Sequence, residues 1–210
     1  MKDLTIITRG PSWKECEFRT KELWGDVCCL VTPGMEDYSY NKLFAFDGEN
    51  VGVKGLENPI LTKALGIARG KGISIVSDKP YATEPFPARE VIQKLKSSYF
   101  MPTVSFMIAY ALYLDYKRLF IHGIDQGPQW EYQSGKMHVM FWIGVATGMG
   151  VEVIMGRNSL WWAYKVGIDG LPDAFFLREG IRIVHHLDSI YGYHGEKISE
   201  AERDEVVHVS

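Results

Sequence analysis

Apolar residues recur along the chain with two different periods, which predict alternating strands and helices. Short apolar runs without alternation predict strands covered on both faces, at about 4–8, 27–31, 42–46, 73–77, 119–121 and 151–155. Apolar positions spaced three and four residues apart predict helices at about 12–23, 59–69, 87–96, 104–112 and 136–148, with a shorter one near 158–164. This alternation is typical of an α/β fold with a mostly parallel, Rossmann-like sheet and helices on both faces.

The last third of the chain follows a different pattern. We therefore expect one α/β domain over residues 1–165 and a C-terminal extension over 166–210. Residues 181–184 are the strongest strand candidate in the extension, and 199–207 has the composition of a polar surface helix. The pattern leaves open whether this part is a lid, an added β element or a contact in a homo-oligomer.

Composition and charge exclude several classes of function. The 210 residues carry a formal net charge of −3, with a pI near 6.1, so nucleic acid is not the expected partner. No apolar run reaches the roughly 18 residues of a membrane span. The three cysteines, Cys16, Cys28 and Cys29, form neither an even disulfide framework nor a metal-ligand pattern. A cytoplasmic protein without a bound metal is the simplest expectation.

The first predicted strand runs directly into a turn of the sequence Thr-Arg-Gly-Pro-Ser, residues 8–12. Gly10 permits a tight turn, Pro11 fits the first position of a helix, and the Ser12 side chain can cap it. Backbone amides in such a turn can bind a phosphate, with Arg9 as the counter-charge. A plain helix cap explains the same residues.

Two further predicted strands end in polar residues and glycine. Asp47 follows the strand at 42–46, and Gly123 and Asp125 follow the strand at 119–121. Because parallel strands end at one edge of a sheet, these positions predict a ligand crevice there. Asp125 could accept hydrogen bonds from sugar hydroxyls, hold a metal or cap a loop.

A candidate general base lies in the segment that follows. Glu131 belongs to a polar and aromatic loop suited to a sugar or a base, and His138 lies at the start of the helix predicted over 136–148. A helix N-terminus lowers the pKa of a histidine, so His138 could be neutral near pH 7 and accept a proton. A surface imidazole is the alternative. The chain has neither Gly-x-Gly-x-x-Gly after its first strand nor a Walker-type motif.

Three of these segments together resemble known families. Residues 8–12, the Gly-Ile-Asp at 123–125, and 150–154 followed by 158–160 resemble a set found in bacterial sialyltransferases that use CMP-sialic acid. The same order is similar to that of archaeal 6-hydroxymethylpterin diphosphokinase-like and flagellin-modification proteins. A group of phage-encoded Rossmann-like proteins of similar length resembles residues 3–163, in the segments 98–100, 109–111 and 141–144.

The resemblance implies a nucleotide-binding domain over 1–165 and roles for single residues. In the sialyltransferases a Gly-Asn-Gly-Pro-Ser turn holds the nucleotide; this chain matches it at Gly10, Pro11 and Ser12 and has Arg9 in place of the asparagine. Thr103 corresponds to the Ser or Thr that begins a helix in that family. Its catalytic histidine lies about one helical turn before the position of His138. Where the phage group has a glutamate, this chain has Met140.

These observations give three functional hypotheses. The leading one is a glycosyltransferase-like protein that uses a nucleotide-sugar donor and an unknown acceptor and requires no metal. Its nucleotide would contact Gly10, Ser12, Asp47, Thr103 and Gly123. His138 would deprotonate the acceptor, and Asp125 or Glu131 would orient the sugar or a metal. The second is Mg²⁺-dependent diphosphoryl transfer from ATP to a small hydroxymethyl compound, in which Asp47 and Asp125 would hold the Mg²⁺. The third is an inactive nucleotide-binding phage accessory protein in the host cytoplasm.

Overall fold

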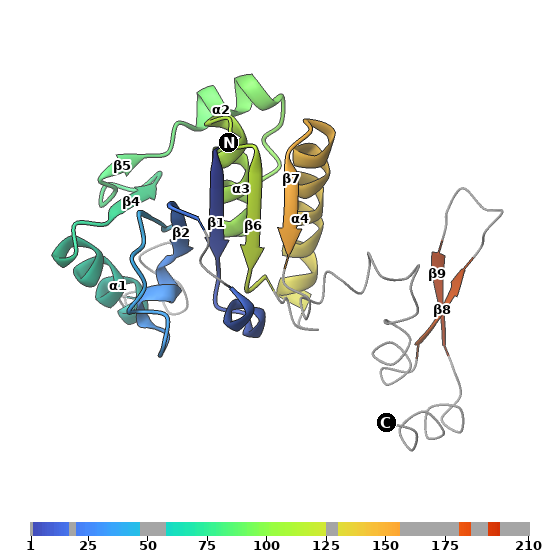
Figure 1. Ribbon diagram of the computed structural model, residues 1–210, viewed down its shortest axis with the longest axis horizontal. Helices are drawn as coiled ribbons and strands as arrows, with labels where there is room; N and C mark the ends of the chain where they lie inside the picture. The colour runs from blue at the N-terminus through green and yellow to red at the C-terminus, as the bar shows by residue number, and fades with distance from the viewer. Residues whose placement is uncertain are drawn as a thin grey trace, which may run out of the picture. The chain divides into compact units, whose positions relative to one another are not determined.

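The computed structural model describes residues 2–16, 20–46, 58–124, 130–155, 181–185 and 193–197. Contacts divide the chain into two units, Met1–Ser159 and Leu160–Ser210. The first unit contains a seven-stranded sheet in which every neighbouring pair of strands is parallel (Figure 1). The predicted α/β, Rossmann-like fold is therefore confirmed.

The strands and helices of the first unit largely alternate along the chain. The strands are β1 (Asp3–Ile7), β2 (Leu23–Asp26), β3 (Lys42–Phe44), β4 (Ser74–Ser77), β5 (Glu84–Pro85), β6 (Arg118–His122) and β7 (Glu152–Met155). The α-helices are α1 (Pro59–Gly70), α2 (Ala88–Leu95), α3 (Thr103–Tyr113) and α4 (Trp130–Gly148). Two short 3₁₀ helices, η1 (Pro11–Glu15) and η2 (Val27–Val31), follow β1 and β2.

The strand order β5-β4-β3-β2-β1-β6-β7 places the start of the chain near the middle of the sheet. From β1 the chain proceeds outward through β2, β3, β4 and β5, and then returns through α2 and α3 to β6 on the other side of β1. The direction of winding therefore reverses between β1 and β6. In sheets of this kind ligands bind beyond the carboxyl ends of the strands, at such a reversal.

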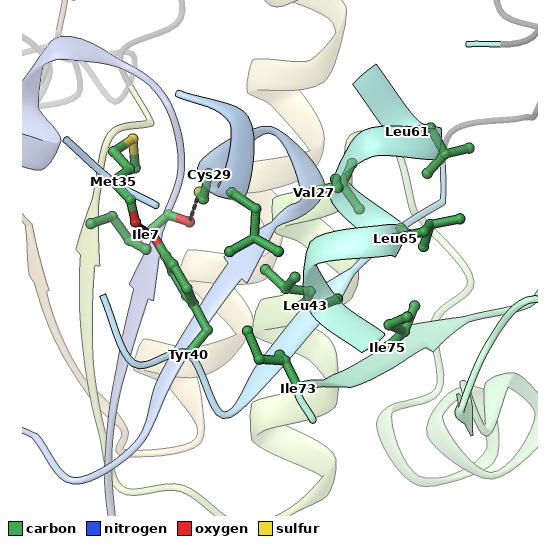
Figure 2. Close-up of a cluster of buried hydrophobic side chains, with 14 of the residues drawn as sticks. Ile7, Val27, Cys29, Met35, Tyr40, Leu43, Leu61, Leu65, Ile73 and Ile75 are labelled. Atoms are coloured by element: carbon green, nitrogen blue, oxygen red, sulfur yellow. Dashed lines mark hydrogen bonds between the residues drawn. The ribbon is translucent and has the colours of Figure 1, made fainter. Parts of the chain in front are cut away.

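One face of the sheet is covered by α1 and η2. Ile7, Leu43 and Ile75 lie in one row across the strands and pack with Leu61 and Leu65 of α1 in a buried cluster (Figure 2). Gly25 completes this row between Ile7 and Leu43. A Cβ on Gly25 would lie 2.7 Å from the Tyr40 ring, so a side chain in that position would displace the tyrosine.

The opposite face is covered by α3 and α4. Ile6, Trp24 and Lys42 lie in one row on this face, and the Trp24 ring packs on Tyr110 of α3 with ring centroids 5.7 Å apart. Trp142 of α4 is fully buried and stacks on Phe100. The sheet thus has helices on both faces, as the uninterrupted apolar runs of its strands predict.

Three predicted elements of the first unit have different bounds. Residues 27–31 form η2, and the strand β2 precedes them; the helix predicted over 12–23 is replaced by the five-residue η1. α4 begins at Trp130 rather than near 136, and the sequence pattern missed β5. The helix predicted at 158–164 lies outside the described residues.

The second unit contains an antiparallel pair, β8 (Ile181–His185) and β9 (Tyr193–Lys197). The strand predicted at 181–184 is confirmed, and the sequence pattern did not predict its partner. The helix predicted at 199–207 lies outside the described residues. In the part of the chain that the structure describes, none of the helices has the length and hydropathy of a membrane-spanning segment.

A candidate anion-binding site at the carboxyl edge of the sheet

The turn after β1 is bonded to the end of β6, where the winding of the sheet reverses. The Thr8 amide donates to the His122 carbonyl oxygen (2.9 Å) and the Gly10 amide to the Gly123 carbonyl oxygen (2.8 Å). The Gly123 amide in turn donates to Oγ of Ser12, which is buried (3.0 Å). The structure thus brings together Gly10, Ser12 and Gly123. Their contact with a nucleotide stays a prediction. In this conformation the Gly10 amide already donates its hydrogen bond to the Gly123 carbonyl oxygen.

A pocket of about 400 Å³ lies beside this junction. It is formed by the turn after β1, by η2 and by the first turn of α1, each of which follows the carboxyl end of a strand. Its lining residues are Arg9, Cys28, Val31, Thr32, Pro33, Pro59, Ile60 and Lys63. Both cationic side chains, Arg9 and Lys63, belong to exposed residues. Among the lining residues that the structure describes, two are cationic and none is acidic, which favours an anionic ligand.

The amides at the start of α1 are already occupied by a cap. Oδ1 of Asn58 accepts hydrogen bonds from the amides of Ile60 (3.1 Å) and Leu61 (3.2 Å). An anion in this pocket would therefore be held by the side chains of Arg9 and Lys63 rather than by these amides. The positive end of the helix dipole adds to the attraction.

Asp26 lies at the end of β2 and links the pocket to the core. Its Oδ1 accepts a hydrogen bond from the Cys29 amide (3.1 Å) and thereby caps η2. Burial raises the pKa of Asp26, while the hydrogen bond with the Cys29 side chain and the charge of Arg9 act in the opposite direction. Nη1 of Arg9 also lies 3.9 Å from Sγ of Cys28.

The two adjacent cysteines have different surroundings. Cys28 is partly exposed and lines the pocket. Cys29 is fully buried, and its Sγ lies 3.3 Å from the carbonyl oxygen of Ile7 (Figure 2). Burial raises the pKa of the Cys29 thiol well above its ordinary value, and the neighbouring Asp26 raises it further. Cys29 is thus a neutral core thiol, whereas Cys28 is accessible from the pocket.

His138 does not lie beside this pocket. It is in the third turn of α4, and its ring stacks on Tyr99 with ring centroids 3.8 Å apart. The pocket lies on the α1 side of the sheet, whereas α4 packs with α3 on the opposite side. His138 does not lie at a helix N-terminus, contrary to the prediction, because α4 begins eight residues before it. Its role as a general base stays a prediction.

The other predicted site residues are only partly described. Thr103 begins α3, which runs back toward the start of β6, so Thr103 lies at the carboxyl edge of the sheet. Asp47 and Asp125 lie outside the described residues, as do the side chains of Pro11 and Glu131. Among the described side chains, no three His, Cys, Asp or Glu residues gather as metal ligands.

Of these pocket residues, the sequence pattern predicts Arg9 but not Lys63 or Cys28. Asn58 caps α1 and Pro59 is its first residue, so Lys63 lies in the first turn and a half of the helix. From there a lysine side chain can reach past the start of the helix. That signal was available in Asn58-Pro59. Cys28 was missed because residues 27–31 were assigned to a strand rather than to the turn that lines the pocket.

Comparison with known proteins gives no family assignment. No family model matches the chain, and no curated protein matches it. Two solved structures that match are of the sialyltransferase CstII from Campylobacter jejuni. The complex with the substrate analogue CMP-3FNeuAc has 13% identity and a TM-score of 0.41, covering 77% of this chain and 83% of that one. The complex with cytidine-5'-monophosphate has 16% identity and a TM-score of 0.36, covering 81% and 85%.

Proposed function

We propose that this chain is a nucleotide-sugar-dependent glycosyltransferase whose donor places its phosphate between Arg9 and Lys63. The observation that carries the proposal is that these two cations, far apart in sequence, line one pocket at the carboxyl edge of the sheet. The pocket volume of about 400 Å³ is in the range of small-molecule sites. The resemblance of residues 8–12 and 123–125 to a nucleotide-binding set supports the choice of a nucleotide.

The proposed chemistry uses the two cations on the leaving group. The bond between the anomeric carbon and a phosphate oxygen breaks, and the oxygen takes the electron pair. The acceptor hydroxyl oxygen forms the new bond to that carbon and loses its proton to a general base at the same edge of the sheet. Arg9 and Lys63 would stabilise the charge that develops on the phosphate, so the reaction as proposed needs no metal.

Nucleotide binding tests the first part of this proposal. We expect CMP or UDP to raise the melting temperature of the full chain without Mg²⁺, since a ligand that binds the native state stabilises it. Lys63→Gln should weaken binding about tenfold, because it removes one of two charged contacts to the phosphate. Arg69→Gln is the matched control, because Arg69 is also exposed on α1 but lies outside the pocket.

Two outcomes would contradict the proposal. If no nucleotide changes the melting temperature, the pocket does not hold a nucleotide. If only ATP with Mg²⁺ stabilises the protein, diphosphoryl transfer becomes the better hypothesis. Transfer itself is then measured as release of free nucleotide from CMP-linked and UDP-linked sugars, with and without EDTA.

Alkylation of cysteine locates the bound nucleotide within the protein. Cys28 lines the pocket, whereas Cys16, also partly exposed, does not. A nucleotide bound at Arg9 and Lys63 should slow the reaction of Cys28 with iodoacetamide and leave the rate at Cys16 unchanged. Equal protection of both thiols, or of neither, would place the nucleotide elsewhere.

A further inference from the structure

The exposed apolar side chains of the first unit are concentrated in one region. Among the described residues, six of the seven large apolar side chains that are exposed lie on α4, directly after it, or on the segment before α3; these are Tyr99, Met101, Met137, Met140, Phe141 and Met149. Single exposed apolar residues are common, but a group of this kind marks a surface that another molecule covers.

α4 is apolar on its outward side as well as on the side that faces the sheet. Val139, Trp142 and Ala146 are fully buried against the first unit. On the other side Met137 is 59% exposed and Phe141 39% exposed. The sequence from 137 to 151 contains no Asp, Glu, Lys or Arg. A helix that is apolar all round is normally buried on all sides.

The outward side of α4 combines a ridge and a hollow. At 100° per residue, Met137, Phe141, Gly144 and Gly148 lie on one side of the helix, opposite Val139 and Ala146. The first two carry large side chains. Gly144 and Gly148 carry none, and a Cβ at either position would meet no atom within 4 Å. The first half of this side therefore projects and the second half is recessed.

We propose that this side of α4 is a homodimer interface, in which the α4 helices of two copies pack antiparallel. A two-fold axis between Trp142 and Ile143 would pair Met137 with Gly148 of the second copy and Phe141 with its Gly144. Each large side chain then meets a glycine, so the ridge of one helix fits the hollow of the other and the helices approach closely.

The ridge and the hollow complement each other across a two-fold axis, and the absence of charge fits the same occupant, a second copy. A surface without charge is complementary to itself across a two-fold axis, because no like charges are brought together. A charged peptide or a nucleic acid would find no ionic partner over residues 137–151. An anionic membrane surface is attracted by Lys and Arg on the polar side of a helix, and this stretch has neither.

Sedimentation equilibrium of the full chain tests this interface. We expect a dimer at micromolar concentration, and Gly144→Glu should weaken it by about tenfold or more because a charge enters the contact. The same substitution should keep or raise the melting temperature of the monomer, since the position is open and Glu is a better helix former than Gly. Gly66→Glu is the matched control, because Gly66 lies in α1, is exposed and is equally open.

Exchange of the ridge and the hollow tests the antiparallel pairing. Gly144→Phe alone should weaken the dimer, because two large side chains would then meet. Addition of Phe141→Ala should restore it, because the large and the small residue are again paired. A monomeric wild-type protein at about 100 μM would overturn the proposal, as would a dimer that Gly144→Glu and Gly144→Phe leave unchanged. Binding of the wild type to anionic vesicles as a monomer would assign the surface to a membrane instead.

Discussion

Gly123 lies so close to the backbone of Thr8 that no side chain fits at position 123. A Cβ on Gly123 would lie 1.8 Å from the Thr8 carbonyl oxygen, and the residue has φ of +76°. Both features demand glycine at the point where β6 meets the turn after β1. That turn also carries Arg9, so the position of Arg9 in the pocket depends on this contact.

Gly123→Ala should lower the free energy of unfolding by about 2–5 kcal/mol. The positive φ costs about 1–2 kcal/mol for alanine, and the overlap with backbone atoms adds a packing cost of about 1–3 kcal/mol. Gly72→Ala is the control, because Gly72 has φ of +66° and open space around its Cβ position. Urea denaturation measures both variants. Equal losses for the two would show that the contact with Thr8 contributes nothing.

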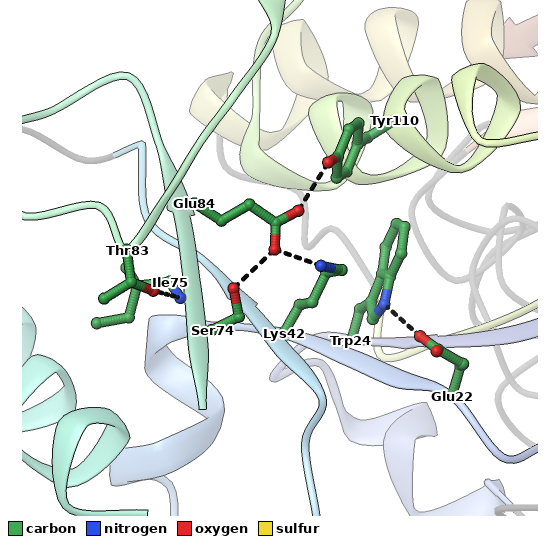
Figure 3. Close-up of polar contacts among 8 residues, drawn as sticks. All are labelled: Glu22, Trp24, Lys42, Ser74, Ile75, Thr83, Glu84 and Tyr110. Carbon is green, nitrogen blue, oxygen red and sulfur yellow. Dashed lines mark hydrogen bonds and ion pairs between the residues drawn. The ribbon is translucent and has the colours of Figure 1, made fainter. Parts of the chain in front are cut away.

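Glu84 makes the stability of the fold depend on acid pH. It accepts hydrogen bonds from Lys42, from Ser74 (2.7 Å) and from the Tyr110 hydroxyl (2.7 Å) (Figure 3). Burial by itself would raise the pKa of Glu84, but these three contacts together lower it below 4.5. A lowered pKa stabilises the fold above the unfolded-state pKa, and this contribution is lost as the pH falls through the folded-state value.

Glu84→Gln should therefore lower the free energy of unfolding at pH 7 by about 1–3 kcal/mol, because Lys42 is left without its counter-charge. The loss should shrink as the pH falls below 4.5, where the wild-type carboxylate also becomes protonated. Asp78→Asn is the control, since it breaks the more exposed ion pair with Lys79 and should change stability little. Denaturant titrations at pH 7 and pH 3 measure the free energy of unfolding of both variants. If the loss in Glu84→Gln were the same at both pH values, the electrostatic explanation would be excluded.

Asp26 should have the opposite dependence on pH. Burial raises its pKa above 3.8, so the fold binds a proton here more tightly than the unfolded chain does. Its contribution to stability is then largest below pH 3.8 and declines as the pH rises through the folded-state pKa. Asp26→Asn removes this decline and keeps an oxygen that accepts from the Cys29 amide. The variant should be at least as stable as the wild type at pH 7, and a lower stability there would show that the charge itself stabilises the turn.

Strands and helices with a strong apolar period could be predicted from the sequence. α1, α2, α3, β4, β6 and β7 lie within about two residues of their predicted bounds. The elements between β1 and β3 could not be predicted from the sequence. Residues 23–25 and the run at 27–31 are both apolar enough to form a buried strand. The choice depends on Asp26, whose side chain caps η2, and on Gly25, where a side chain would crowd the Tyr40 ring and the Cys29 sulfur. Both are contacts made in the folded structure, and the spacing of apolar residues does not reveal them.

For the candidate site, the sequence predicted only the location, which is the carboxyl edge of the sheet. The turn at 8–12 indicated where β1 ends, and Gly123 indicated a close approach, which the structure explains by its contact with Thr8. Lys63 belongs to a different element and reaches the pocket only because β3 lies beside β2 in the sheet, so that α1 packs on η2. Strand order decides that proximity, and the sequence pattern predicts strands without their order.

Asn58 offers a way to change the charge of the pocket without loss of the helix cap. Its side chain caps α1, whose next residue, Pro59, lines the pocket. Aspartate caps a helix as well as asparagine does and interacts favourably with the helix dipole, so Asn58→Asp should keep the free energy of unfolding within about 0.5 kcal/mol. Asn58→Ala should lower it by about 1 kcal/mol, because two amides lose their acceptor.

The two variants should differ in nucleotide binding for separate reasons. Asn58→Asp adds a negative charge beside a pocket that owes its attraction for anions to Arg9 and Lys63, so the affinity for CMP or UDP should fall several-fold, by more at low salt than at high salt. Asn58→Ala loosens the first turn of α1 without a change of charge, so any loss of affinity should not depend on salt. Isothermal titration at about 20 and 300 mM salt separates the two. If Asn58→Asp bound nucleotide as tightly as the wild type at both concentrations, the ligand would not be held through its phosphate at this end of the pocket.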